Sequence, residues 1–83
     1  MDLNFSNASE EEISEFYRKL SNTIKKKRIE KNMKQLEVAL EIGIKSVAFY
    51  SNCENLRYGK HFNIEHVYKL AKLFEMKPYE LLK

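Results

Sequence analysis

Glycine and proline are scarce in this chain, and their scarcity limits the folds available to it. Its 83 residues include two glycines, Gly43 and Gly59, and one proline, Pro78. All-β folds use both residue types in their many turns. The composition therefore favours an all-α fold, with these three residues marking points where helices end or begin.

The length and the cysteine content further limit the class of protein to which the chain can belong. A chain of 83 residues has room for one small domain. Its single cysteine, Cys53, cannot form an internal disulfide bond, and no apolar stretch approaches the roughly 18–20 residues that cross a membrane. Since no leader segment is evident either, we expect a cytoplasmic protein with no membrane contact.

An apolar stripe near the start of the chain predicts a long first helix. Ser9 followed by Glu12 fits a capping box, in which each side chain satisfies a backbone N–H group at the start of a helix. Apolar residues then recur at steps of three and four: Ile13, Phe16, Tyr17, Leu20 and Ile24. Asn32 is the expected end of this helix.

Four shorter helices are predicted after Asn32. In the first, at about 34–42, the expected inward residues are Leu36, Val38, Ala39 and Ile42, and Gly43 supplies the left-handed turn at its end. Ser46 caps the next helix, whose apolar stripe is Val47, Tyr50 and Cys53. After a loop at 56–62, Asn63 caps a helix with Ile64, Val67, Leu70, Ala71 and Phe74 on its buried side. Pro78 begins a last helix with Tyr79, Leu81 and Leu82.

The net charge of +3 is unevenly distributed along the chain. Residues 1–19 carry a net charge of −3, whereas residues 20–83 carry +6. A basic body attached to an acidic start makes a polyanionic partner for the body a hypothesis to test. On charge alone the favoured interpretation is that the lysines only solvate exposed helix faces.

The segment from Gln35 to Asn55 has the spacing of two short helices joined by a tight turn. Gln35, Ala39 and Gly43 fall at four-residue steps. A small residue such as Ala39 lets two helices cross closely, and Gly43 allows a positive φ in the connection. The second helix then lies across the first, and its outer face is free to enter a DNA groove.

Around this unit the chain resembles the Cro/C1-type helix-turn-helix family of phage repressors, small bacterial regulators and restriction–modification controller proteins. The similar stretches are IKKKRIEKNMKQ (24–35), VALEIG (38–43), YSNCEN (50–55) and NIEHVYKLAKLFEMKPYELL (63–82). The resemblance implies a five-helix lambda-repressor-like domain at 20–83. Residues 1–19 would be an N-terminal extension that begins an extended first helix.

The resemblance leaves two registers open for the helix after the turn. In the usual spacing Phe49 is its first core residue, and Arg28 is free to reach DNA. One extra residue in the turn would instead make Tyr50 the core residue, with Cys53 one turn later. We favour this shifted register because it places Val47, Tyr50 and Cys53 on one apolar stripe with a spacing of three residues. It also pairs Arg28 with Glu54, as the family's arginine–glutamate salt bridge does.

The resemblance and the side-chain chemistry together give candidate DNA contacts. Candidates for reading bases from the third helix are Lys45, Ser46, Val47, Ala48, Ser51 and Asn52. Candidates for phosphate contact are Lys34 and Gln35 at the start of the second helix, and Arg57, Lys60 and His61 in the 56–62 loop. The acidic start of the first helix is expected to point away from this face.

These features predict a DNA-binding transcriptional regulator, a repressor or controller protein that binds a palindromic operator in double-stranded DNA as a homodimer. The last helix is the candidate dimer contact, and the alternative is that it only closes the helix bundle. The alternative is a protein–protein interaction or antitoxin-like module with the same fold. His61 and His66 are five residues apart and do not share a helix face, and no nucleophile–base pair or glycine-rich phosphate loop is present. We therefore expect no enzyme activity, metal, cofactor or small-molecule ligand.

Overall fold

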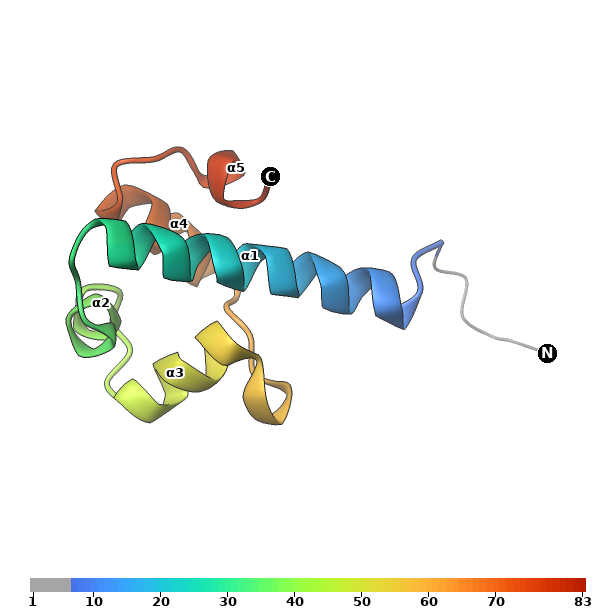
Figure 1. Cartoon of the computed structure of the whole chain (residues 1–83), viewed down its shortest axis with the longest axis horizontal. Coiled ribbons are helices and arrows are strands. Elements are labelled where there is room, and N and C mark those ends of the chain that lie inside the picture. The colour runs from blue at the N-terminus through green and yellow to red at the C-terminus, as the bar shows by residue number, and fades with distance from the viewer. Residues whose placement is uncertain (1–6) are drawn as a thin grey trace.

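A long helix, α1 (Glu10–Glu30), crosses the molecule, and four shorter helices pack around its C-terminal half (Figure 1). In this computed structural model, which describes residues 7–83, they are α2 (Gln35–Glu41), α3 (Val47–Asn55), α4 (Ile64–Leu73) and α5 (Pro78–Leu81), with a 3₁₀ turn at Arg57–Gly59. In the view of Figure 1, α2 and α3 lie on one side of α1 and α5 lies on the other. The expected all-α fold is confirmed for the described residues, and the first six residues of the expected 1–19 extension lie outside them.

Three helices start at the polar residues that the sequence predicts as caps. The Ser9 hydroxyl accepts a hydrogen bond from the Glu12 backbone N–H group at 3.1 Å, which is the serine half of the predicted capping box. Ser46 caps α3 in the same way. Asn63 caps α4 by accepting from the His66 N–H group at 2.8 Å. Each bond satisfies an N–H group that has no partner inside its helix, so these side chains fix where the helices begin.

The core forms where the inner faces of the helices meet. Its largest fully buried side chains include Ile24, Tyr50, Phe62, Leu70 and Leu81. Further positions predicted to face inward are buried as well: Leu20, Val38, Ala39, Ile42, Cys53, Val67, Ala71 and Phe74. Helical periodicity therefore identifies most of the core from the sequence.

Five apolar residues predicted to face the core are instead exposed: Ile13 (46%), Phe16 (49%), Leu36 (50%), Val47 (42%) and Ile64 (76%). Leu36 lies two residues before Val38, which places it on nearly the opposite face of α2. Ile64 is the first residue of α4 and lies at the end of the helix. Ile13 and Phe16 belong to the part of α1 that projects past the other helices in Figure 1.

Gly43 ends α2 with a φ of +82°, in the left-handed region where a side chain is strained. A Cβ atom there would meet only the Lys69 Nζ at 3.7 Å, an ordinary contact, so its cost comes from the backbone alone. We expect Gly43→Ala to lower the free energy of unfolding by about 1–2 kcal/mol. Urea denaturation followed by circular dichroism measures this, with the exposed Glu41→Ala as a control. Equal midpoints for Gly43→Ala and the unchanged protein would contradict the prediction.

Candidate nucleic-acid interface

The residues of α3 divide into a buried inner face and a free outer face. Tyr50, Cys53 and Glu54 are buried, and the Ser21 hydroxyl of α1 donates a hydrogen bond to the Cys53 carbonyl oxygen at 3.1 Å. With α3 fixed to α1 through this face, the opposite face carries small and amide side chains. We call this the outer face of α3 and define it by Ala48, Ser51, Asn52 and Asn55.

The inner face of α3 follows the shifted register, in which the turn between α2 and α3 has one residue more than in the usual family spacing. Tyr50 and Cys53 are both fully buried, whereas Phe49 is only partly buried. Asn52, which the usual family spacing would place in the core, lies on the outer face. The predicted pairing of Arg28 with Glu54 is present, so Arg28 is bonded within the protein rather than free.

Glu54 joins three helices through one carboxylate. Arg28 of α1 donates from Nε to Oε2 at 3.0 Å and from Nη2 to Oε1 at 2.9 Å. Its Nη1 donates to the Met33 carbonyl oxygen at 3.0 Å, and Gln35 Nε2 at the start of α2 donates to the same Glu54 Oε1 at 3.1 Å. The Glu54 side chain is 0% exposed and that of Arg28 is 12% exposed. The pair is therefore buried, and its charges depend on each other.

The electrostatics of this cluster favour the ionised pair. Burial by itself would raise the pKa of Glu54, but hydrogen bonds from Arg28 and Gln35 hold it below its usual value. The hydrogen bond with Glu54 raises the pKa of Arg28. Burial, with the nearby Glu54 carboxylate, also raises the pKa of Tyr50, whose hydroxyl has no hydrogen-bond partner among the described residues. At neutral pH a charged Arg28–Glu54 pair beside a neutral phenol therefore connects α1, α2 and α3.

The two phosphate candidates at the start of α2 are both partly engaged within the protein. Lys34 is exposed, but its backbone N–H group donates to the Glu37 carboxylate at 2.8 Å. Gln35 is half-buried, and its amide belongs to the Glu54 cluster. At the start of α2, the Lys34 ammonium group therefore remains available to a phosphate.

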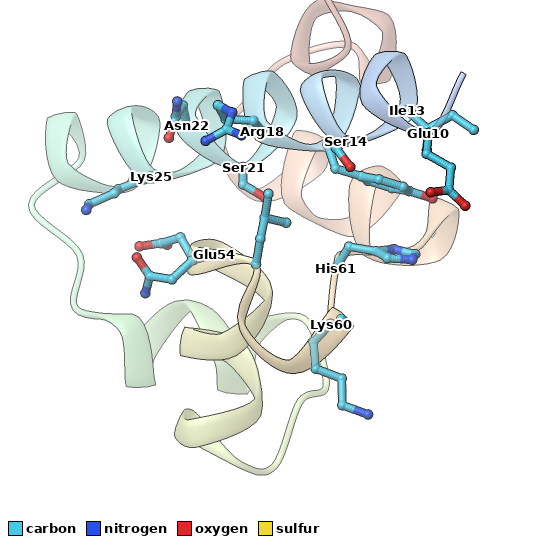
Figure 2. A pocket seen from close by; sticks show the side chains of 14 residues that line it. Glu10, Ile13, Ser14, Arg18, Ser21, Asn22, Lys25, Glu54, Lys60 and His61 are labelled. Carbon is cyan, nitrogen blue, oxygen red and sulfur yellow. The ribbon is translucent and has the colours of Figure 1, made fainter. Parts of the chain in front are cut away.

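The three candidates for phosphate contact in the loop after α3 differ in their contacts within the protein. Arg57 and Lys60 are exposed, and no salt bridge within residues 7–83 involves either side chain. Figure 2 shows the Lys60 side chain extending away from α1. His61 instead stacks on Tyr17 of α1, with ring centroids 4.0 Å apart and an interplanar angle of 22°. The geometry thus favours a structural role for His61 and leaves Arg57 and Lys60 available to DNA.

The base-reading candidates lie at the start of α3 and along its outer face. Lys45 and Ser46 precede the helix, Val47 and Ala48 begin it, and all four are exposed. The Ser46 hydroxyl accepts from the Phe49 N–H group at 3.1 Å and keeps its own proton for donation. Ser51 and Asn52 follow one turn later and are half-buried. The structure thus gathers these six residues at one end and one side of a single helix.

Asn55 joins the outer face, and sequence reasoning missed it. Ala48, Asn52 and Asn55 are separated by four and three residues, the repeat of one helix face, and this spacing is the signal that identifies it. The Asn55 side-chain nitrogen donates to the Ser51 carbonyl oxygen at 2.9 Å and to its hydroxyl at 3.3 Å. Its Oδ1 bonds no group in the described part of the chain, so it is available as an acceptor.

A groove of about 700 Å³ separates the N-terminal half of α1 from the end of α3 and the loop that follows (Figure 2). Its lining includes Tyr17 from α1 and Lys60 and His61 from the loop. Glu10 lines it as well, so one residue of the acidic start of α1 lies beside the groove that the basic loop borders. The reason is helical spacing, because Glu10 and Tyr17 lie on the same face of α1 as Ser21, which contacts α3.

Comparison with models of protein families found a match to helix-turn-helix family HTH_3 over residues 24–81, from the second half of α1 to the end of α5. The chain belongs to the Cro/C1-type helix-turn-helix family. Comparisons with curated proteins and with solved structures found no match.

As a Cro/C1-type helix-turn-helix protein, this chain is a DNA-binding regulator, and α2 and α3 form its helix-turn-helix unit. Within residues 7–83 no helix is long and apolar enough to cross a membrane. The same residues contain no group of three or more His, Cys, Asp or Glu side chains placed to hold a metal ion.

Proposed function

We propose that this helix-turn-helix protein represses or controls transcription in the cytoplasm by binding a palindromic operator as a homodimer. The observation that carries the proposal is the free outer face of α3, which the buried Arg28–Glu54 pair holds in place from the inner side. A helix anchored in this way can present its side chains to the major groove. The DNA-binding unit of the proposal is the domain at 20–83, with residues 1–19 as its extension.

The side chains of α3 favour adenine and thymine contacts. The amides of Asn52 and Asn55 can bond two atoms on the edge of an adenine, and Val47 and Ala48 can contact a thymine methyl group. Neither arginine nor glutamine lies within α3. We therefore propose that the shape and deformability of the operator contribute part of the sequence preference.

Cations at both ends of the helix-turn-helix unit are proposed to contact phosphates. Arg57 and Lys60 follow the C-terminal end of α3, and Lys34 precedes α2. Phosphate contacts of this kind fix the position of a protein on the duplex without reading its sequence. These phosphate contacts hold the outer face of α3 against the bases that lie between the contacted phosphates.

A second copy of this chain completes the proposed complex. Two copies related by a two-fold axis would place their α3 helices one turn of DNA apart, roughly 34 Å. We assign the dimer contact to α5, where Leu81 closes the core and Tyr79 is 58% exposed. An exposed aromatic side chain beside a closed core is suited to contact with a partner.

A salt series tests the proposal. Binding to random-sequence duplex is measured from low to moderate ionic strength, and a preferred site is then selected from a random library. We expect salt-dependent binding and a palindromic site. Absence of salt-dependent binding at low ionic strength would overturn the proposal.

Matched lysine variants locate the DNA-binding surface. Lys60→Gln is expected to weaken binding to all sequences and to lower the slope of log Kd against log salt by about one. Lys72→Gln, which removes the same charge from an exposed position of α4, is the control and should leave the slope unchanged. The same change of slope in both variants would contradict the assigned surface.

A second candidate function has one observation in its favour. Ile13 and Phe16 are about half exposed on the acidic projecting part of α1, which suits contact with a protein partner. An interaction or antitoxin-like module would use this surface, either instead of DNA binding or together with it. Selection that returns no preferred DNA site would favour this module over the regulator.

A further inference from the structure

The loop after α3 concentrates strained backbone. Three of its four residues at 56–59 have a positive φ: Leu56 (+55°), Tyr58 (+57°) and Gly59 (+69°). Residues other than glycine, asparagine and aspartate rarely adopt this left-handed conformation, because the Cβ atom comes too close to the backbone. Such strain persists only where the surroundings impose it, and it often occurs at functional sites.

For two of these residues, the positive φ has an explanation within the protein. Gly59 has no Cβ atom and adopts a positive φ at no steric cost. Leu56 is the residue that ends α3, and its half-buried side chain lines the groove beside α1. Its left-handed backbone therefore both stops the helix and packs a side chain.

Tyr58 has no such explanation. Its side chain is 84% exposed, and within residues 7–83 it makes no hydrogen bond and no ring contact. The fold therefore gains nothing from this ring while its backbone is strained. The strain instead belongs to a residue with an exposed aromatic side chain, which lies in the sequence between the exposed cations Arg57 and Lys60, directly after α3.

We propose that Tyr58 contacts the sugar–phosphate backbone of DNA, with its hydroxyl donating to a phosphate oxygen and its ring packing on a deoxyribose. The inference rests on the proposed function and adds a contact that the charges alone do not supply. The exposed cations before and after Tyr58 in the loop favour a polyanion over a protein surface as its partner. Tyrosine hydroxyl groups are common donors to DNA phosphates.

The test uses a substitution that separates folding from binding. Tyr58→Gly is expected to raise Tm by about 4 °C, because glycine adopts the left-handed conformation without strain. The same variant should bind the selected operator about 30-fold more weakly, since the hydroxyl and the ring contacts are both lost. Tyr58→Phe, which loses only the hydroxyl, should bind about tenfold more weakly. A residue with a merely structural role would not combine a gain in Tm with a loss of affinity.

Glu75 provides the matched control. It also has a positive φ (+58°) and an exposed side chain, but it follows α4. Glu75→Gly should raise Tm by a similar amount, and its operator affinity should equal that of Glu75→Gln, which makes the same change of charge. Because Tyr58→Gly and Tyr58→Phe leave the number of lysine and arginine contacts to phosphates unchanged, both variants should keep the salt slope of the unchanged protein.

Two results would overturn the inference. One is a Tyr58→Gly variant that binds the operator as tightly as the unchanged protein, and the other is a variant that binds more weakly only because its Tm has fallen. If the unchanged protein itself does not bind DNA, the proposed function fails first. Operator binding by the unchanged protein therefore separates the two failures.

Discussion

Glu54→Ala is expected to lower the free energy of unfolding by about 3–5 kcal/mol, because it leaves the buried guanidinium of Arg28 without its partner. Small domains have total stabilities of about 5–15 kcal/mol, so the loss is a large fraction of the whole. The variant also removes the acceptor of the Gln35 amide. We expect α2 and α3 to lose their fixed positions relative to α1. Urea denaturation followed by circular dichroism measures the loss.

Glu65→Ala is the matched control for this variant. Glu65 and Lys69 form a salt bridge of 2.8 Å, as short as that of the buried pair, but both side chains are exposed. Water screens an exposed pair, so its removal should change stability far less. Equal losses in the two variants would show that burial does not determine the strength of the Arg28–Glu54 pair.

The contribution of Glu54 to the free energy of unfolding should also depend on pH, and the lowered pKa of Glu54 gives the direction. The pKa of Glu54 is lowered in the folded protein, so the folded state binds its proton less readily than the unfolded state does. Its stabilisation is therefore present above the pKa of the unfolded carboxyl, about 4.5, and is lost as the pH falls through the lower folded pKa. The stability difference between the unchanged protein and Glu54→Gln should shrink below pH 4.5. A constant difference from pH 7 to pH 3 would contradict this.

Phe62→Ala is expected to cost about 3–5 kcal/mol of unfolding free energy through the cavity it leaves in the core. Phe62 is 2% exposed, and its ring centroid lies 5.3 Å from that of Tyr50 and 6.0 Å from that of His66. It anchors the end of the loop that carries Arg57 and Lys60. We therefore also expect weaker DNA binding, even at temperatures where the variant remains folded.

Tyr68→Ala is the comparison for this second variant. Tyr68 is an aromatic residue of α4 with 58% exposure, and its removal should change stability by no more than about 0.5 kcal/mol. Thermal unfolding and operator affinity are measured for both variants. A Phe62→Ala protein that unfolds at the temperature of Tyr68→Ala would contradict the anchoring role.

Local chemistry explains why much of the fold could be predicted from the sequence. Ser9, Ser46 and Asn63 cap helices through bonds that span three residues, so sequence spacing is sufficient to find them. The pairing of Arg28 with Glu54 was expected from the family's arginine–glutamate salt bridge, once the apolar stripe of the third helix had indicated its register. The caps needed no knowledge of how the helices pack, whereas the pair depended on the resemblance to the family.

The features that could not be predicted depend on what lies beside a residue in space. Leu36 and Phe16 are apolar at plausible positions, but no neighbouring helix covers them. The contact between His61 and Tyr17 joins residues 44 positions apart, and the groove that contains Glu10 arises only when the loop packs beside α1. The left-handed backbone at Tyr58 has no sequence signal, because tyrosine is an unusual residue for it.

The anchoring of α3 through its inner face has a consequence for how such a protein can change. The side chains of its outer face are exposed or half-buried, and their hydrogen bonds within the described residues run from Asn55 to Ser51. Under the proposed function, substitutions at Ala48, Ser51, Asn52 and Asn55 are therefore expected to change which operator is recognised without removing the buried side chains that hold α3 in place.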